Sequence, residues 1–232
     1  MASTPPGLSV AANLDAVRAR INAAAERAGR DPASITLVAA TKGVDPVRLI
    51  EALDAGLDHC GENIVQDAEE RIAALGPRAG GVTWHFIGHL QSNKAGAALN
   101  LFDILESVDS VRLAEQISRR AEAAAKHEVR VLLEVNVALE PSKYGFRPEE
   151  VPAAIATISR LPNLTLEGLM TVAPAVADPE QVRPVFRELR QLAQANGLSQ
   201  LSMGMTNDFE VAIEEGATSV RVGRAIFGER TR

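Results

Sequence analysis

Lys42 is the residue whose type and position best suit covalent chemistry. It directly follows the apolar run Ile35–Thr41, which is typical of a buried strand. An amine attacks an aldehyde or ketone only in its neutral form, and burial lowers the pKa of a lysine because it disfavours the charged form. We therefore predict that the Lys42 side chain projects into a partly dry cavity and acts there as a nucleophile. The alternative is a strand-end lysine that simply reaches solvent.

Two blocks near the C-terminus could hold an anion such as a phosphate group. Leu201–Asp208 reads Leu-Ser-Met-Gly-Met-Thr-Asn-Asp, and Val222–Gly228 reads Val-Gly-Arg-Ala-Ile-Phe-Gly. Small residues ahead of a helix expose backbone N–H groups at its positive end. The candidate phosphate contacts are Ser202, Gly204, Met205, Gly223 and Arg224. Ordinary helix capping by Thr206, Asn207 or Asp208 would explain the first block without a ligand.

Other polar residues lie at or near the ends of apolar runs. Arg221 lies inside the last run, Ser219–Val222, where an arginine needs a specific partner because it stays ionised. Asn63 follows the second run, where it could cap a helix or lie beside a bound ring. Lys94 and Lys143 could guide an anionic ligand inward, although such residues are usually solvated.

The remaining reactive residue types do not form a recognisable site. His85 and His89 are four residues apart, but the segment is a predicted strand broken by Gly88, so we expect no metal site. His59 and Cys60 are adjacent, so on a strand they point to opposite faces and cannot pair as nucleophile and base. Cys60 is the only cysteine, which excludes an internal disulfide and is consistent with a reducing cytoplasm.

The elements that must position these residues follow a regular alternation. Short apolar runs alternate with amphipathic stretches, which is typical of successive βα units in a parallel sheet. The predicted strands are Ile35–Thr41, Leu57–Gly61, Trp84–Ile87, Ile104–Val108, Val129–Val137, Leu164–Val172, Gln200–Met203 and Ser219–Val222. The predicted helices between them are Pro46–Ala55, Ile64–Leu75, Gln91–Leu99, Val111–Lys126, Pro148–Arg160, Pro179–Asn196 and Asn207–Glu215.

Eight such units favour closure into a single (β/α)8 barrel of the TIM type, an α/β fold whose active site lies at the carboxyl ends of the strands. The second and seventh strands are short, so a doubly wound sheet is the alternative. Leu8–Ala28 has helical spacing and predicts an N-terminal covering helix within an extension at residues 1–30. No linker or composition break divides the chain, so residues 1–232 are interpreted as one domain.

Composition excludes several classes of function. The net charge is −6, and no cluster of basic residues indicates a nucleic-acid partner. The first ten residues lack the pattern of a secretory signal, and no apolar stretch approaches the ~20 residues that span a bilayer. We therefore expect a cytoplasmic protein with no membrane partner, and a monomer because no long exposed apolar stripe is evident.

Taken together, these residues resemble the pyridoxal phosphate homeostasis protein family, also described as YggS-like or proline synthase co-transcribed proteins. The blocks that carry the resemblance are Ala40-Thr-Lys-Gly, Gly61-Glu-Asn-Ile-Val-Gln, Trp84-His-Phe-Ile-Gly-His-Leu-Gln-Ser-Asn-Lys, Gly168-Leu-Met, Leu201-Ser-Met-Gly-Met-Thr-Asn-Asp and Val220-Arg-Val-Gly-Arg-Ala-Ile-Phe-Gly. The chain departs from the common pattern at Gly43–Asp45, where many members have a second lysine followed by proline. It also has Ile64 in place of a usual tyrosine, and Arg224 in place of a small or hydroxyl residue.

The resemblance implies a barrel similar to the N-terminal domain of alanine racemase, with pyridoxal 5'-phosphate (PLP) held as an internal aldimine on Lys42. It further implies Asn63 near the ring and Arg221 at the pyridine nitrogen. The implied phosphate contacts are Ser202, Gly204, Met205, Gly223 and Arg224. It implies no catalytic residue and no metal.

The function implied by the resemblance is a non-catalytic PLP carrier in vitamin B6 homeostasis, with PLP-dependent apoenzymes as recipients. One alternative is a PLP-dependent amino-acid racemase, which needs an acid/base group on the second face of the substrate carbon. Alanine racemases bring a tyrosine for this from another domain and subunit, whereas this chain has one tyrosine, Tyr144, and no room for that domain. The other alternative is an aldolase that uses Lys42 directly on a sugar phosphate.

Overall fold

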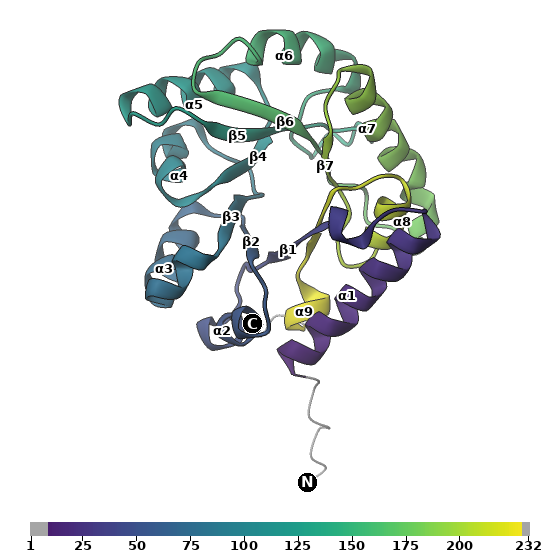
Figure 1. Cartoon of the computed structure of the whole chain (residues 1–232). Helices are drawn as coiled ribbons and strands as arrows, with labels where there is room; N and C mark the ends of the chain where they lie inside the picture. The colour runs from purple at the N-terminus through teal and green to yellow at the C-terminus, as the bar shows by residue number, and fades with distance from the viewer. Residues whose placement is uncertain (1–8, 229–232) are drawn as a thin grey trace.

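Eight parallel strands form a closed barrel in the order β1 to β8 in the computed structural model, which describes residues 9–228 (Figure 1). The strands are β1 (Thr36–Ala40), β2 (His59–Glu62), β3 (Thr83–Phe86), β4 (Ile104–Val108), β5 (Val129–Glu134), β6 (Leu164–Met170), β7 (Gln200–Ser202) and β8 (Ser219–Val222). The first and last strands pair over four positions, from Thr36 opposite Ser219 to Ala39 opposite Val222, and this pairing closes the ring. The predicted barrel is therefore confirmed, and the doubly wound sheet is excluded.

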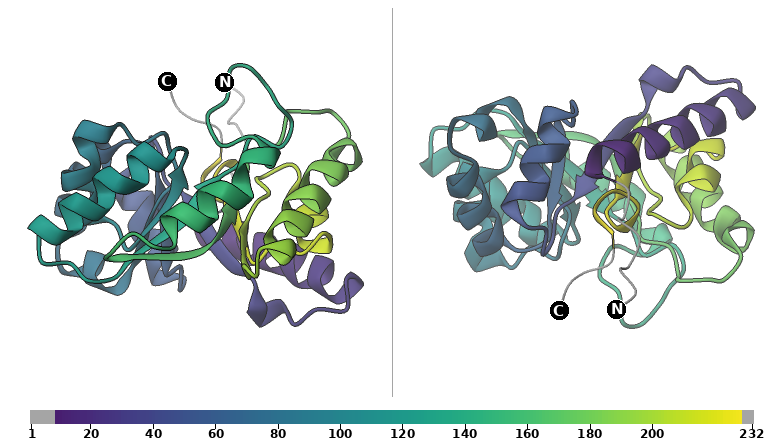
Figure 2. Two further views of the ribbon diagram at one scale, coloured as in Figure 1. Left: turned by 90° about the horizontal axis from the view of Figure 1, so that it is seen from above. Right: turned by 90° about the horizontal axis from the view of Figure 1, so that it is seen from below.

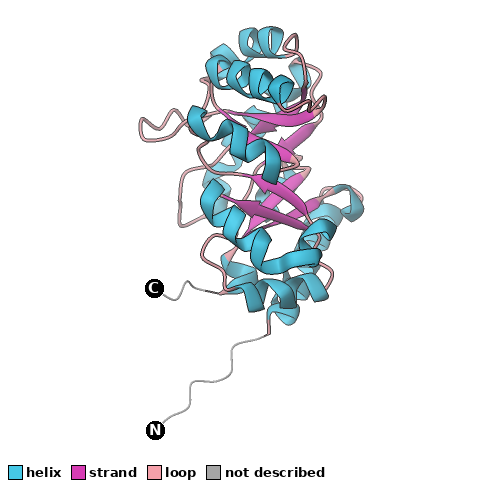
Figure 3. Ribbon diagram, turned by 90° about the vertical axis from the view of Figure 1, so that its left-hand side faces the viewer, coloured by secondary structure: helices cyan, strands magenta, loops and turns pink. Residues whose placement is uncertain are grey.

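The helices form an outer layer around the strands (Figure 3). They are α1 (Val10–Arg27), α2 (Pro46–Asp54), α3 (Val65–Leu75), α4 (Ala95–Leu101), α5 (Val111–Ala123), α6 (Val151–Ile158), α7 (Arg183–Ala195), α8 (Phe209–Glu214) and α9 (Arg224–Phe227). Three predicted helices begin with a separate 3-10 turn, at Ser92–Lys94, Pro148–Glu150 and Pro179–Val182. No helix in the described part of the chain is long and apolar enough to cross a membrane.

The predicted covering helix is α1, which packs against α2, α8 and α9. Its buried face carries Leu14, Val17 and Ile21. The guanidinium of Arg18 donates hydrogen bonds to the carbonyl of Ala55 (2.9 Å) and to that of the next residue (2.6 Å), which ties α1 to the end of α2. The helix therefore bridges the first and last βα units. The expected start at Leu8 lies outside the described residues.

The interior of the barrel is unusually polar. TIM barrels are generally filled by branched apolar side chains. Val38 is such a residue in this barrel. It lies opposite Arg221 in the strand register, so the two side chains are on the same face of the sheet. Yet the buried residues also include Arg221, Glu106, His85 and a serine at the end of β7. Because these groups must be paired when buried, they are organised into a hydrogen-bonded cluster described below.

Candidate functional site

A cavity of about 810 Å³ lies at the carboxyl end of the barrel. Its walls come mainly from the segments after β1, β6, β7 and β8 and from α3. Five of the eight predicted ligand contacts line it, namely Lys42, Met205, Arg221, Gly223 and Arg224. Figure 2 shows that α9 and the loop after β5 lie on the same side of the barrel. Segments far apart in the sequence thus converge on one space large enough for a small cofactor.

Lys42 lines this cavity but is exposed rather than buried. The expectation of a partly dry environment for its amine is wrong, because the chain turns outward immediately after the buried Thr41. Gly43 takes a φ of 71° in this turn, a conformation that glycine adopts without strain. The structure therefore places the amine at the cavity opening, where an incoming molecule can reach it.

An ion pair outside the barrel holds both ends of the Lys42 turn. The carboxylate of Glu62 accepts hydrogen bonds from the Thr41 hydroxyl (2.5 Å) and the guanidinium of Arg71 on α3 (2.5 Å). Arg71 also donates to the carbonyl of Val44. Burial raises the pKa of Glu62. The sequence did not predict this ion pair, because the spacing of Glu62 and Arg71 does not distinguish a buried pair from charged residues on the exposed face of a helix.

Arg221 lies at the inner end of the cavity and is 4 % exposed. Its guanidinium donates to the Ser202 hydroxyl through Nη1 (2.5 Å) and to the Thr171 carbonyl through Nη2 (2.8 Å). Nη1 also lies 3.9 Å from a carboxylate oxygen of Glu106. Burial lowers the pKa of Arg221, while Glu106 and nearby carboxylates oppose that effect. The predicted need for a specific partner is therefore confirmed, and the partners are Ser202, Thr171 and Glu106.

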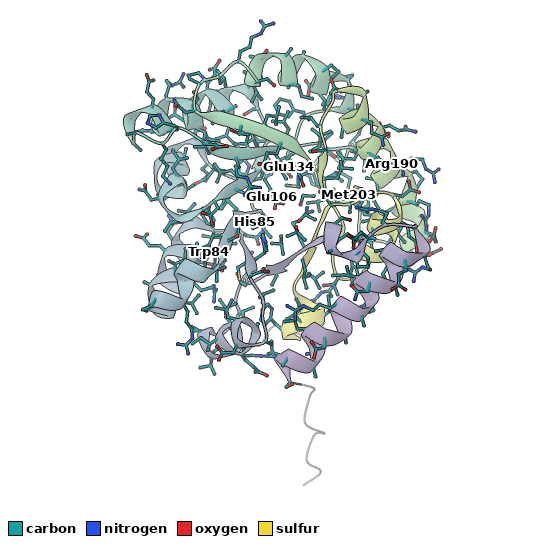
Figure 4. All side chains as sticks on the ribbon, viewed as in Figure 1. Trp84, His85, Glu106, Glu134, Arg190 and Met203 are labelled. Carbon is teal, nitrogen blue, oxygen red and sulfur yellow. The ribbon has the colours of Figure 1, made fainter. Side chains whose placement is uncertain are left out.

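Glu106 connects Arg221 to two histidines. Its second oxygen lies 2.6 Å from Nδ1 of His85, and Nε2 of His85 lies 2.9 Å from Nδ1 of His59. Burial raises the pKa of Glu106, but the hydrogen bond and charge of His85, together with Arg221 and Ser202, outweigh it and hold that pKa below its usual value. Figure 4 shows His85 and Glu106 toward the middle of the ring of strands. Neither histidine belongs to a metal cluster, as none occurs within residues 9–228.

The two predicted anion-binding turns have tight backbones. Gly204 has a φ of 93°, and a Cβ there would lie 2.6 Å from the Cβ of Ala212. A Cβ on Gly223 would lie 3.1 Å from the Ala40 carbonyl oxygen. Short helices start after both turns, at Phe209 and Arg224, and the first N–H groups of a helix have no partner inside it. The amide of Met205 is used within the first turn, where it donates to the Asp208 carboxylate (2.5 Å).

Three predicted contacts lie off the cavity wall. Ser202 and Gly204 are buried and do not line the cavity. Asn63 lines a smaller cleft of about 180 Å³ between the segments after β2 and β3, together with His89 and Lys94. Its backbone is closely packed, since a Cβ on Gly88 would lie 2.2 Å from the Asn63 carbonyl oxygen.

The loop after β5 carries the single tyrosine. Tyr144 is 55 % exposed and stacks on His89, with ring centroids 3.6 Å apart and planes at 11°. His89 also lies 3.1 Å from a carboxylate oxygen of Asp109. Lys143 donates to the Val172 carbonyl (3.0 Å) and pairs with a glutamate of the same loop. These contacts attach the loop after β5 to the loops after β3 and β6.

Comparison with known proteins identifies close relatives. Residues 12–231 match the family model described as alanine racemase, N-terminal domain. The chain is 42 % identical to a pyridoxal phosphate homeostasis protein of Pseudomonas aeruginosa, covering 96 % of both chains. It is 40 % identical to the protein of that name in Escherichia coli, covering 95 % of this chain and 97 % of the other.

Solved structures agree with these matches. PipY of Synechococcus elongatus, described with PLP bound, superposes with a TM-score of 0.81 at 35 % identity, over 94 % of this chain and all of the other. An alanine racemase of Clostridium difficile superposes with a TM-score of 0.74 at 14 % identity, over 97 % of this chain and 57 % of that chain. The second likeness shows a shared fold alone.

Proposed function

The chain belongs to the pyridoxal phosphate homeostasis protein family, and we propose that it binds PLP in the cavity at the carboxyl end of the barrel. We further propose that it acts in intracellular vitamin B6 homeostasis, without robust catalysis of its own. The observation that best supports this proposal is that three features line or adjoin the same cavity. These are a reachable lysine, a fixed buried arginine and two glycine-containing turns that precede helices.

The residues fit the chemistry of the cofactor. When bound, PLP supplies an aldehyde that condenses with an amine, and Lys42 places an exposed amine on the cavity wall. The turn at Gly223–Arg224 would hold the phosphate through backbone N–H groups, whereas the amide of Met205 already donates to Asp208, so Met205 stays a prediction as a phosphate contact. Asn63, Ser202 and Gly204 stay predictions as ligand contacts, since they lie beside or beneath the cavity rather than on its wall.

Arg221 supports a holding role rather than a catalytic one. A permanent cation facing the pyridine nitrogen would keep that nitrogen unprotonated and weaken the ring as an electron sink. The position of Tyr144 further disfavours a racemase, because its ring is mostly exposed and stacked on His89. The same proposal includes PLP-dependent apoenzymes as recipients, which the family resemblance implies. It also includes a monomeric cytoplasmic carrier, which the sequence pattern predicts.

Borohydride trapping tests the proposal directly. Purified protein is mixed with PLP, reduced with borohydride and digested, and the modified peptide is identified by mass spectrometry. We expect the adduct on Lys42, together with a yellow protein whose visible band disappears in Lys42→Ala. Lys94→Ala and Lys143→Ala are matched controls that keep the band. Absence of any adduct, or an adduct only on another lysine, would contradict the assignment.

A further inference from the structure

A continuous set of polar side chains crosses the inside of the barrel, and we call it the interior polar chain. Its members are His59, His85, Glu106, Ser202 and Arg221. They come from β2, β3, β4, β7 and β8. Since β4 and β7 are not neighbours in the sheet, the contact between Glu106 and Ser202 must pass through the lumen rather than along the sheet. The chain therefore connects opposite sides of the barrel beneath the cavity.

The hydroxyl of Ser202 has a fixed direction in this chain. It lies 2.5 Å from Oε2 of Glu106 and 2.5 Å from Nη1 of Arg221. A hydroxyl has one proton to donate, a carboxylate can only accept, and a guanidinium can only donate. Ser202 therefore donates to Glu106 and accepts from Arg221. Its only proton is used, and its side chain is fully buried.

Glu106 supplies the charge that a buried arginine needs. It is 1 % exposed, and its two oxygens are directed to different partners, Ser202 on one side and His85 on the other. The guanidinium of Arg221 is held at two points, by Ser202 and by the Thr171 carbonyl. This leaves its remaining N–H groups for the cavity that Arg221 lines.

We propose that Ser202 and Glu106 are positioning residues, which fix the orientation of Arg221 at the inner end of the cavity and do not themselves contact the ligand phosphate. This inference rests on the proposed binding of PLP. On this proposal, Ser202 orients Arg221, which would face the ring of the cofactor, and Ser202 does not contact the phosphate. Glu106, which the sequence did not single out, helps Ser202 to orient Arg221.

The test compares PLP with pyridoxal, which has the same ring and aldehyde but no phosphate. Affinities are measured by absorbance titration of the wild type and of Ser202→Ala. If Ser202 acts through Arg221, the substitution should weaken both compounds by a similar factor of about ten, near the low end of what losing one hydrogen bond to a charged group costs. If the hydroxyl contacts the phosphate, only PLP should be weakened, and the inference is overturned.

Ser219→Ala is the matched control. Ser219 lies opposite Ser202 in the strand register, and its buried hydroxyl has no hydrogen-bond partner within residues 9–228. Removing this hydroxyl should leave both affinities unchanged. An equal loss in Ser219→Ala and Ser202→Ala would show a general effect of altering the barrel interior, and would contradict a specific role for Ser202.

A double variant identifies the residue through which Ser202 acts. In the Arg221→Met background, adding Ser202→Ala should change neither affinity further, because the group to be oriented is gone. In the native background, Ser202→Ala and Glu106→Gln should both shift the absorption maximum of the bound cofactor. The two shifts should have the same direction, because both substitutions remove a group that orients Arg221. A further loss of affinity in the double variant would refute the proposal. If the folded wild type binds neither compound, the proposed function itself fails, whereas a phosphate-selective loss overturns only this inference.

Discussion

Glu134 is a buried carboxyl whose protonation should affect how stability depends on pH. It ends β5, and Figure 4 shows it near the middle of the ring of strands. Burial, together with the charge of Asp109, raises its pKa from 4.5 to about 7, although Arg221 and Lys143 partly oppose this. The folded protein therefore holds a proton on Glu134 over a pH range in which the unfolded chain has lost it.

Glu134→Gln should flatten the dependence of stability on pH. Because the folded state binds this proton more tightly, the free energy of unfolding of the wild type falls as pH rises from about 4.5 to about 7. The free energy of unfolding of the glutamine variant should not fall in this way. Its difference from the wild type should therefore grow over that range, in favour of the variant, to about 1–3 kcal/mol at pH 8. Urea unfolding at several pH values measures it. Exposed Glu188→Gln is the control, and parallel curves for the wild type and Glu134→Gln would contradict the pKa shift.

For individual side chains, the sequence predicts which of them reach the cavity better than it predicts what surrounds them there. Lys42 and Arg221 were found because each is anomalous beside an apolar run, and both line the cavity. The exposure of Lys42 could not be predicted, because it depends on the direction of one turn. Glu106 was missed because its partner Ser202 is 96 residues away and reached only across the closed barrel.

Among the elements, the turn after β1 depends on an ion pair between Glu62, which ends β2, and Arg71 on α3. Arg71→Met on α3 would leave Glu62, which is fully buried, without its cation. Breaking such a pair costs about 3–5 kcal/mol, and we expect a loss of that size in urea unfolding. Borohydride trapping of PLP on Lys42 should also slow, because the Thr41–Val44 segment loses a support at its far end.

Two further variants separate pairing from charge. Glu62→Gln combined with Arg71→Met removes both charges and should recover part of the lost stability. Arg78→Met is the control, since that side chain is 57 % exposed and its carboxylate partner lies 3.8 Å away, so the change should cost less than about 0.5 kcal/mol. A double variant no more stable than Arg71→Met alone would mean that packing rather than charge matters at this position.

Strands were easier to predict than helix starts. All eight predicted strands occur, including the short β2 and β7, although β2 reads His-Cys-Gly-Glu and is not a continuous apolar run. Helix starts differ by a few residues where proline begins a 3-10 turn, as at Pro148 and Pro179. The four-residue α9 was not predicted, because one helical turn is too short to show a period.

For the whole molecule, closure of the barrel brings the two ends of the chain into one structural unit. Strand β1 pairs with β8, and α1 packs against α8 and α9, which belong to the last two βα units. Arg20 and Arg27 of α1 add ion pairs to Glu210 and Glu214 on α8. Unfolding of β1 or β8 would therefore open the ring, and α1 is attached to both sides of this closure. Chains of this length often unfold through intermediates, but this arrangement favours a single cooperative transition.

Leu14→Ala tests that cooperativity from a site on the covering helix. Leu14 is fully buried on α1, so the truncation should lower the free energy of unfolding by about 2–5 kcal/mol. The only tryptophan, Trp84 on β3, is 4 % exposed and lies across the barrel from α1 (Figure 4). If the barrel unfolds as one unit, Trp84 fluorescence and far-ultraviolet circular dichroism should shift to the same lower midpoint in urea. Asp15→Ala, at a 77 % exposed neighbour, should shift neither signal. A circular dichroism midpoint that falls while the Trp84 midpoint stays in place would instead show that α1 detaches from an intact barrel.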